Sequence, residues 1–259
     1  MIELRTLGTA ALVVNGDHRR LPTQKHLALL VYISFHQGLT VRRDRLASLL
    51  WEDAGRRQGL HSVSQALYAI RTILPELRLL SDRSEVLLPE GAIRVDALEF
   101  IQAASSNQLA HAEQLYNGRF LGDFWIQGAA LFEEWKEAQH HRIEGLARHI
   151  YWDLLRTSER AGDWIGVERI ATKMLAMDPF DEKVHRARIL AIAAGGSVHR
   201  AITELRNLEQ MIGHELGRPV DAETSAIADR LHRMMDHGPH SMVRNEPTNA
   251  VIEPFVGRR

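Results

Sequence analysis

The sequence of 259 residues contains no cysteine, and this absence excludes several classes of protein at once. Disulfide frameworks, cysteine-ligated zinc sites, iron–sulfur clusters and thiol catalysis all need that residue. The chain also has no apolar run of the roughly eighteen residues that a membrane helix needs, and Met1 to Arg5 lack the apolar core of a signal peptide. We therefore expect a cytoplasmic protein that makes no use of the membrane.

Net charge is also small, at −1, which argues against a protein covered everywhere in basic residues. The distribution is uneven, because residues 1–98 have a net charge of +3 and the rest of the chain has −4. This excess permits a local phosphate-binding face in the N-terminal part. With 45% hydrophobic and 25% charged residues, the composition predicts a folded chain of two domains.

The most informative segment runs from Thr40 to Leu74 and predicts two amphipathic helices joined by a polar turn that contains glycine. Their apolar positions follow helical spacing: Leu46, Leu49 and Leu50 in the first helix, and Val63, Leu67, Ile70 and Leu74 in the second. The other side of the second helix is polar. Such a pair is typical of a DNA-binding helix-turn-helix, although helical hairpins with one apolar face also occur in ordinary all-α cores.

Short strands are predicted before this segment and after it. Residues 2–7 and 10–14 lead into Asn15-Gly16, a strong hairpin signal, and His18–Leu21 can return as a strand. Thr23 is a candidate N-cap for a helix with an inward face of Leu27, Leu30 and Val31. After the helix pair, Leu77–Leu80 and Glu85–Leu88 predict a hairpin with Arg83 at its tip. Strands, three helices and a hairpin form a winged helix.

From Asp96 to about residue 236 the pattern is helical throughout. Turns at Gly162 and Gly196 are 34 residues apart, which matches the period of tetratricopeptide repeats. The predicted fold class is therefore mainly α with a small β component: an N-terminal winged helix-turn-helix followed by an all-α tetratricopeptide-like domain. Residues 237–259 lose the helical period and are predicted to be a linker.

Several short motifs, in this order and at this spacing, resemble the bacterial activators called Streptomyces antibiotic regulatory proteins. They are Leu4–Gly8, Lys25–Leu30, Asp44-Arg45-Leu46, Leu50-Trp51, Ile70-Arg71, Val95-Asp96-Ala97, Tyr116–Leu121, Trp135, Gly162-Asp163, Asp178-Pro179, His185-Arg186 and Leu216-Gly217 with Pro219. The resemblance implies an OmpR-type winged helix at residues 1–95 and a bacterial transcriptional activator domain at 96–236. Pro254 to Arg258 look like the start of the nucleotide-binding ATPase domain of larger members, so we expect 237–259 to lead into such a domain.

The same resemblance implies a transcription activator that binds direct repeats in promoter DNA, self-associates on double-stranded DNA, and helps recruit RNA polymerase, here for a biosynthetic gene cluster. Two departures concern the DNA-binding chemistry. OmpR-type proteins commonly have a basic residue where this chain has Ala69, and Val86-Leu87-Leu88 replaces the usual Gly-Tyr of the wing. Base preference therefore does not transfer from the family.

Candidate DNA contacts follow from the chemistry of base edges and phosphates. For base contacts we select four side chains on the polar side of the second helix: His61, Ser64, Gln65 and Tyr68. An amide such as that of Gln65 can pair with adenine through two hydrogen bonds. For phosphate contacts we select Arg42, Arg43, Arg71 and Arg83, with Lys25 and Arg57 as weaker candidates. The alternative for each is an ordinary solvated surface residue.

No enzyme, cofactor or metal ion is expected. The adjacent His140 and His141 point to different sides of a helix, so they do not form a metal site together. Two other functions stay open: a helical-repeat scaffold whose winged helix contacts protein, and the regulatory half of an ATP-dependent switch. Salt-dependent binding to promoter DNA would distinguish the first of these from a DNA-binding activator.

Overall fold

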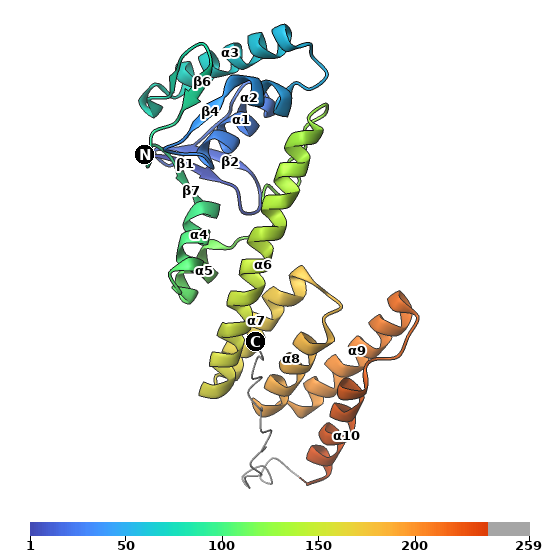
Figure 1. Ribbon diagram of the computed structural model, residues 1–259. Coiled ribbons are helices and arrows are strands. Elements are labelled where there is room, and N and C mark those ends of the chain that lie inside the picture. Colours follow the sequence, from blue (N-terminus) through green and yellow to red (C-terminus); the bar gives the residue numbers. More distant parts are fainter. Residues whose placement is uncertain (238–259) are drawn as a thin grey trace, which may run out of the picture. The chain divides into compact units, whose positions relative to one another are not determined.

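The structure is a computed structural model that describes residues 1–237, with side chains through Leu231, so the predicted linker beyond His237 and the motif at Pro254 lie outside the described residues. Its strands are β1 (Ile2–Arg5), β2 (Ala11–Val14), β3 (Asp17–Arg19), β4 (Thr40–Arg42), β5 (Leu80–Ser81), β6 (Glu85–Leu87) and β7 (Arg94–Val95). Its α-helices are α1 (Gln24–Ser34), α2 (Arg43–Leu50), α3 (Arg56–Ile73), α4 (Asp96–Ser105), α5 (Leu109–Leu115), α6 (Ala130–Ala161), α7 (Trp164–Met177), α8 (Glu182–Ala194), α9 (Val198–Leu216) and α10 (Ala222–His237), and a 3₁₀ turn, η1, spans Pro75–Leu77 (Figure 1).

The N-terminal sheet has the order β3-β2-β1-β7. Its predicted hairpin is confirmed, because Asn15 and Gly16 both have positive φ (53° and 93°), the backbone of a two-residue turn that matches strand twist. The fourth strand, β7, was not predicted. It is only two residues long and pairs in parallel with Glu3 and Leu4, so its apolar pattern is too short to be recognised before its partner is known.

A second sheet, with the order β4-β6-β5, forms the wing. The predicted hairpin of β5 and β6 is present, and β4 adds a third strand that sequence analysis did not foresee. The expected strand at Leu77–Leu80 is wrong in its first half. Pro75 begins η1 there, and Arg78 takes the left-handed conformation with φ of 50°, so the extended chain starts only at Leu80.

Helices α1, α2 and α3 form the body of the winged helix, and the predicted apolar faces are buried. Leu46, Leu49 and Leu50 of α2 and Val63, Leu67 and Ile70 of α3 are all at most 1% exposed. The inward face of α1 is wider than predicted, because Ala28 to Ser34 are all buried. Thr23 occupies the N-cap position of α1, but its hydroxyl contacts Nδ1 of His26 at 2.5 Å, so it forms no side-chain cap.

A second set of contacts joins α4 and α6 to this body. The carboxylate of Asp96, the first residue of α4, accepts hydrogen bonds from the backbone N–H of Thr6 (2.7 Å) and of Leu7 (3.1 Å). Burial raises the pKa of Asp96 and outweighs these hydrogen bonds. On α6, the Trp135 ring lies 5.0 Å from Tyr32 and 5.4 Å from Phe35. Trp135 therefore packs against aromatic residues of α1 and the residue that follows it.

Contacts divide the chain into two compact units, Met1–Leu154 and Leu155–Arg259, and the division falls within α6. In the second unit α7 packs on α8, α8 on α9, and α9 on α10. The 34-residue period is visible in the helix starts, Trp164 and Val198. The residues equivalent at that period, Val167 with Ala201 and Ala171 with Leu205, are all buried. The tetratricopeptide-like arrangement is therefore confirmed.

Glu182 is a buried carboxylate at the start of α8. It accepts hydrogen bonds from Nη1 of Arg218 (2.8 Å) and from the backbone N–H of Asp221 (2.7 Å). Burial alone would raise the pKa of Glu182, but these hydrogen bonds outweigh it and lower the pKa below its ordinary value. The segment before α10 is thereby attached to α8.

We predict that this carboxylate stabilises the folded chain above its unfolded pKa of about 4.3 and that the contribution is lost as pH falls through the lower folded value. Glu182→Gln should be less stable than wild type at pH 7, and the difference should shrink towards pH 3. Urea denaturation followed by circular dichroism measures it, with Glu209→Gln on the exposed side of α9 as control. A difference independent of pH would contradict the prediction.

Candidate nucleic-acid interface

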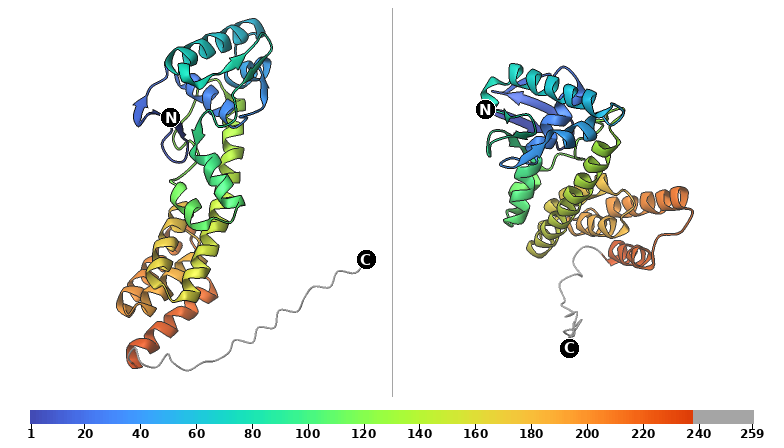
Figure 2. Two further views of the ribbon diagram at one scale, coloured as in Figure 1. Left: turned by 90° about the vertical axis from the view of Figure 1, so that its left-hand side faces the viewer. Right: turned by 45° about the horizontal axis from the view of Figure 1, so that its top comes forward.

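One face of α3 is exposed along its length because the opposite face is buried. Val63, Ala66 and Leu67 pack against α1 and α2, and Gly59 allows close approach to α2, since a Cβ there would lie 3.2 Å from the Cβ of Ala47. In both views of Figure 2, α3 lies along the outer side of the N-terminal winged-helix block. The structure thus places all four predicted base-contacting residues on the exposed face: His61, Ser64, Gln65 and Tyr68.

These four side chains are not equivalent. The hydroxyl of Ser64 donates to the carbonyl of Leu60 (2.9 Å) and accepts from Nη2 of Arg43 (2.7 Å), so its hydrogen-bonding capacity is largely used within the protein. Gln65, His61 and Tyr68 make no side-chain hydrogen bond to any described residue. Tyr68 is 74% exposed, so most of its aromatic ring and its hydroxyl are accessible to solvent. This face is therefore able to make new polar and stacking contacts.

The wing presents Arg83 at its tip, as predicted. The backbone N–H of Asp82 donates to Glu85 O (3.1 Å), which leaves Arg83 and Ser84 as the turn. The carboxylate of Asp82 accepts from the N–H groups of Ser84 (2.7 Å) and Glu85 (2.8 Å). These two hydrogen bonds lower the pKa of Asp82 and fix the turn. Arg83 is exposed and has no ion pair among the residues with described side chains.

Two of the predicted phosphate-contacting arginines also connect α3 or α2 to the wing. Arg43 donates from Nη1 to Asp82 O (3.1 Å) and from Nη2 to Ser64. Arg71 donates from Nε to Leu79 O (3.1 Å) and from Nη2 to the hydroxyl of Ser81 (2.6 Å). This positioning role was not predictable from the sequence, because the acceptors are 8 to 39 residues away and are brought near only by the wing.

Arg42 differs from these two. It is the last residue of β4 and the N-cap residue of α2. Its Nη2 lies 3.3 Å from Asp44, and the Arg42 side chain is 73% exposed. Arg42 can therefore exchange this weak surface ion pair for another anion at little cost.

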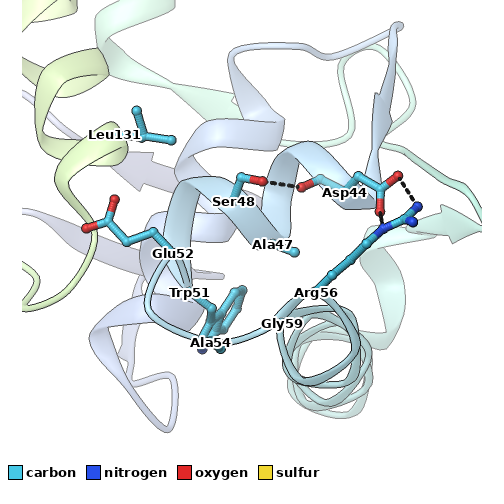
Figure 3. Close-up of a pocket in the computed structure, with 9 residues that line it drawn as sticks. All are labelled: Asp44, Ala47, Ser48, Trp51, Glu52, Ala54, Arg56, Gly59 and Leu131. Atoms are coloured by element: carbon cyan, nitrogen blue, oxygen red, sulfur yellow. Dashed lines mark hydrogen bonds and ion pairs between the residues drawn. The ribbon is translucent and has the colours of Figure 1, made fainter.

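A hollow of about 330 Å³ lies beside α2 (Figure 3). Figure 3 shows Arg56 reaching from α3 to Asp44, with Nε and Nη2 at 3.3 and 3.2 Å from its carboxylate oxygens. The hydrogen bond from Arg56 lowers the pKa of Asp44. Glu52 lines the same hollow and accepts from the N–H of Ala130 at the start of α6 (2.8 Å). Two carboxylates make this hollow unsuitable for a phosphate.

A second hollow, of about 410 Å³, lies between α3 and the start of α1 and was not foreseen from the sequence. Ser62 and Gln65 of α3 line it together with the first turn of α1. Lys25 of α1 lies there, with Nζ 5.8 Å from the centre of the Trp51 ring and 3.4 Å from Gly128 O. Desolvation lowers the pKa of Lys25, against the raising influence of Asp53. The weaker phosphate candidate Lys25 is thus brought beside the exposed face of α3.

The described residues contain no cluster of three or more histidine, aspartate or glutamate side chains able to hold a metal ion. Across the same described part of the chain, every helix is too short or too polar to cross a membrane.

The fold is a winged helix followed by a helical-repeat domain, and the family comparison agrees with the expected class. Residues 92–232, more than half of the chain, match the family model for the bacterial transcriptional activator domain. The chain therefore belongs to this family, whose members are transcription regulators. No curated protein matches the sequence significantly.

One solved structure with a similar fold is Mycobacterium tuberculosis EmbR in complex with a low affinity phosphopeptide. The TM-score is 0.57 at 18% sequence identity, and the match covers 90% of this chain. This chain spans 65% of the length of that chain. At this identity the likeness establishes the fold alone, and it supports the predicted order of a winged helix and an all-α domain.

The contacts of Arg43 generate a prediction about the wing. Arg43→Met keeps the length of the side chain but removes the donors to Asp82 O and Ser64. Amide hydrogen exchange at Ser84 and Glu85 should become about five- to tenfold faster, as expected for about 1 kcal/mol of lost local hydrogen bonding. Arg45→Met, at an exposed position of the same helix, is the control. Equal exchange in the two variants would show that Arg43 does not position the wing.

Proposed function

We propose that this protein is a sequence-specific, DNA-binding transcription activator with an OmpR-type winged helix. The main support is the exposed face of α3, where Gln65, His61 and Tyr68 have no side-chain hydrogen bond within the described protein while the wing holds Arg83 at one end of the same block. A helix of this kind fits the major groove of duplex DNA, and a basic hairpin can contact the phosphate backbone beside that groove. Membership in the transcriptional activator domain family agrees with this proposal.

In this proposal Gln65 contacts a base edge directly. His61 and Tyr68 contact the flanking bases or sugars, and Ser64 acts by holding Arg43 in place. Ala69, at the position where a basic residue is common, makes no charged contact. A single α3 helix therefore supplies few base contacts, and specificity requires two protomers bound side by side on a direct repeat.

Arg83 on the wing and Arg42 before α2 contact the DNA phosphates in this proposal, and both side chains are exposed. Arg43 and Arg71 add charge at the same surface while they position the wing. The helical-repeat unit is proposed to support contacts between protomers and with RNA polymerase. Expression of a biosynthetic gene cluster would be the outcome.

The base-contact proposal predicts a change in sequence preference. Gln65→Ala should remove the preference for adenine at one position of each half-site, at a cost of about 1–3 kcal/mol for that base pair. Selection of bound sequences from a random duplex pool measures it. Gln114→Ala, at an exposed position of α5, is the matched control. An unchanged consensus sequence for Gln65→Ala would contradict the assignment.

The phosphate-contact proposal predicts a change in salt dependence without a change in sequence preference. Arg83→Gln should weaken binding to every sequence by a similar factor and reduce the slope of log K against log salt by about 0.9. Binding titrations between 50 and 200 mM salt measure the slope. Arg142→Gln on α6 removes an equal charge at another exposed position. If both variants keep the wild-type slope, Arg83 does not contact phosphate.

A second candidate function is a protein-interaction scaffold, and one observation favours it. Ile165 of α7 is 84% exposed on the helical-repeat unit, and Tyr68 is 74% exposed on the winged helix, so each unit presents a large apolar side chain to solvent. The scaffold predicts that promoter DNA does not bind even at low salt. The activator predicts binding that weakens steeply as salt increases.

A further inference from the structure

Two adjoining hollows lie around the first turn of α1. The first is the hollow of about 410 Å³ that α3 lines with Ser62 and Gln65. The second, of about 360 Å³, lies between the β2–β3 hairpin and α1. Thr23 and Gln24 line both of them, so the two hollows adjoin at the first turn of α1, one bordered by α3 and the other by β3.

Five of the residues that line the two hollows are basic. His18, Arg19 and Arg20 line the hollow at β3, and Lys25 and His26 line the hollow at α3. We name these five residues the α1 edge. No aspartate or glutamate lines either hollow, in contrast to the hollow beside α2 with Asp44 and Glu52.

Arg19 and Arg20 are the principal charges of the α1 edge. Both are exposed, and neither makes an ion pair with any residue whose side chain is described. Burial lowers the pKa of His26 and so disfavours the charged form of its ring. Asp17 lies at the start of β3, and Asp53 and Glu52 act electrostatically on Lys25. None of these three carboxylates lines the two hollows.

This basic surface adjoins α3, the proposed DNA-contacting helix, so a polyanion that contacts α3 can extend onto it. Duplex DNA carries a phosphate charge about every 1.7 Å along its axis, so backbone extends beyond the bases that α3 contacts. An acidic protein would need carboxylates at matching spacing as well as a shape that fills the two hollows. DNA needs only its regular backbone.

We propose that the α1 edge binds the phosphates of duplex DNA that flanks the half-site contacted by α3, with Arg19 and Arg20 as the principal contacts. This inference rests on the proposed DNA-binding function and extends it on the side of α3 that faces α1. The α1 edge adds affinity that does not depend on sequence, and it lengthens the DNA segment that one protomer occupies.

The test uses the full chain and a duplex that contains the sequence recovered by selection, with flanks on both sides. The double variant Arg19→Gln/Arg20→Gln should reduce the slope of log K against log salt by about 1.8, or 0.9 for each phosphate contact. The control, Arg142→Gln/Arg206→Gln, removes two charges at exposed positions of α6 and α9 and should keep the wild-type slope.

In a second experiment, the DNA flanks on the two sides of the half-site are shortened one at a time. For the wild-type chain, removing one flank should reduce the slope by the same amount as the double variant, and the double variant should be insensitive to that trimming. Trimming the other flank should affect both proteins equally. This pattern would locate the contact on DNA outside the half-site.

The outcomes separate this inference from the proposed function. If wild type binds no duplex at low salt, the proposed function fails and this inference fails with it. If wild type binds and Arg83→Gln reduces the slope, but the arginine pair behaves like its control, only the α1 edge proposal is overturned. It is also overturned if the double variant changes self-association in light scattering while its DNA slope stays at the wild-type value, because the partner is then protein.

Discussion

The winged helix depends on the burial of one apolar stripe of α3 against α1 and α2. Val63, Leu67 and Ile70 are almost completely buried, and removal of such side chains from water is the largest favourable contribution to folding. The stripe also fixes the rotation of α3 about its axis. The polar residues opposite to it are exposed because the stripe is buried, so the same contact that stabilises the fold determines which side chains are candidate DNA contacts.

The arginines around α3 have two different roles. Arg43 and Arg71 use part of their hydrogen-bonding capacity to connect the helices with the wing, while Arg83 and Arg19 are exposed without ion pairs among the residues with described side chains. Guanidinium groups have five N–H donors, so one arginine can position a hairpin and still present donors to a phosphate. A rigid wing holds its terminal charge at a defined distance from α3, which a mobile loop would not do.

Features set by local sequence were predictable, and features set by distant partners were not. Asn15-Gly16 specifies its own turn, and the spacing of Val63, Leu67 and Ile70 specifies which side of α3 is buried. By contrast, β4 and β7 are two or three residues long and become strands only because β6 and β1 supply their hydrogen bonds. The positions of the candidate DNA contacts on α3 followed from helical spacing. The links from Arg43 and Arg71 to the wing did not, because the acceptors depend on the tertiary fold.

The hydrogen bonds from Thr6 and Leu7 to Asp96 have an evolutionary consequence. Two amide groups at the end of the first strand find their acceptor on the helix that follows the winged helix, and β7 completes the N-terminal sheet just before that residue. Buried amides without an acceptor are costly. Recombination between Val95 and Asp96 would therefore separate donors from their acceptor, and lineages should inherit the winged helix together with α4 as one heritable module.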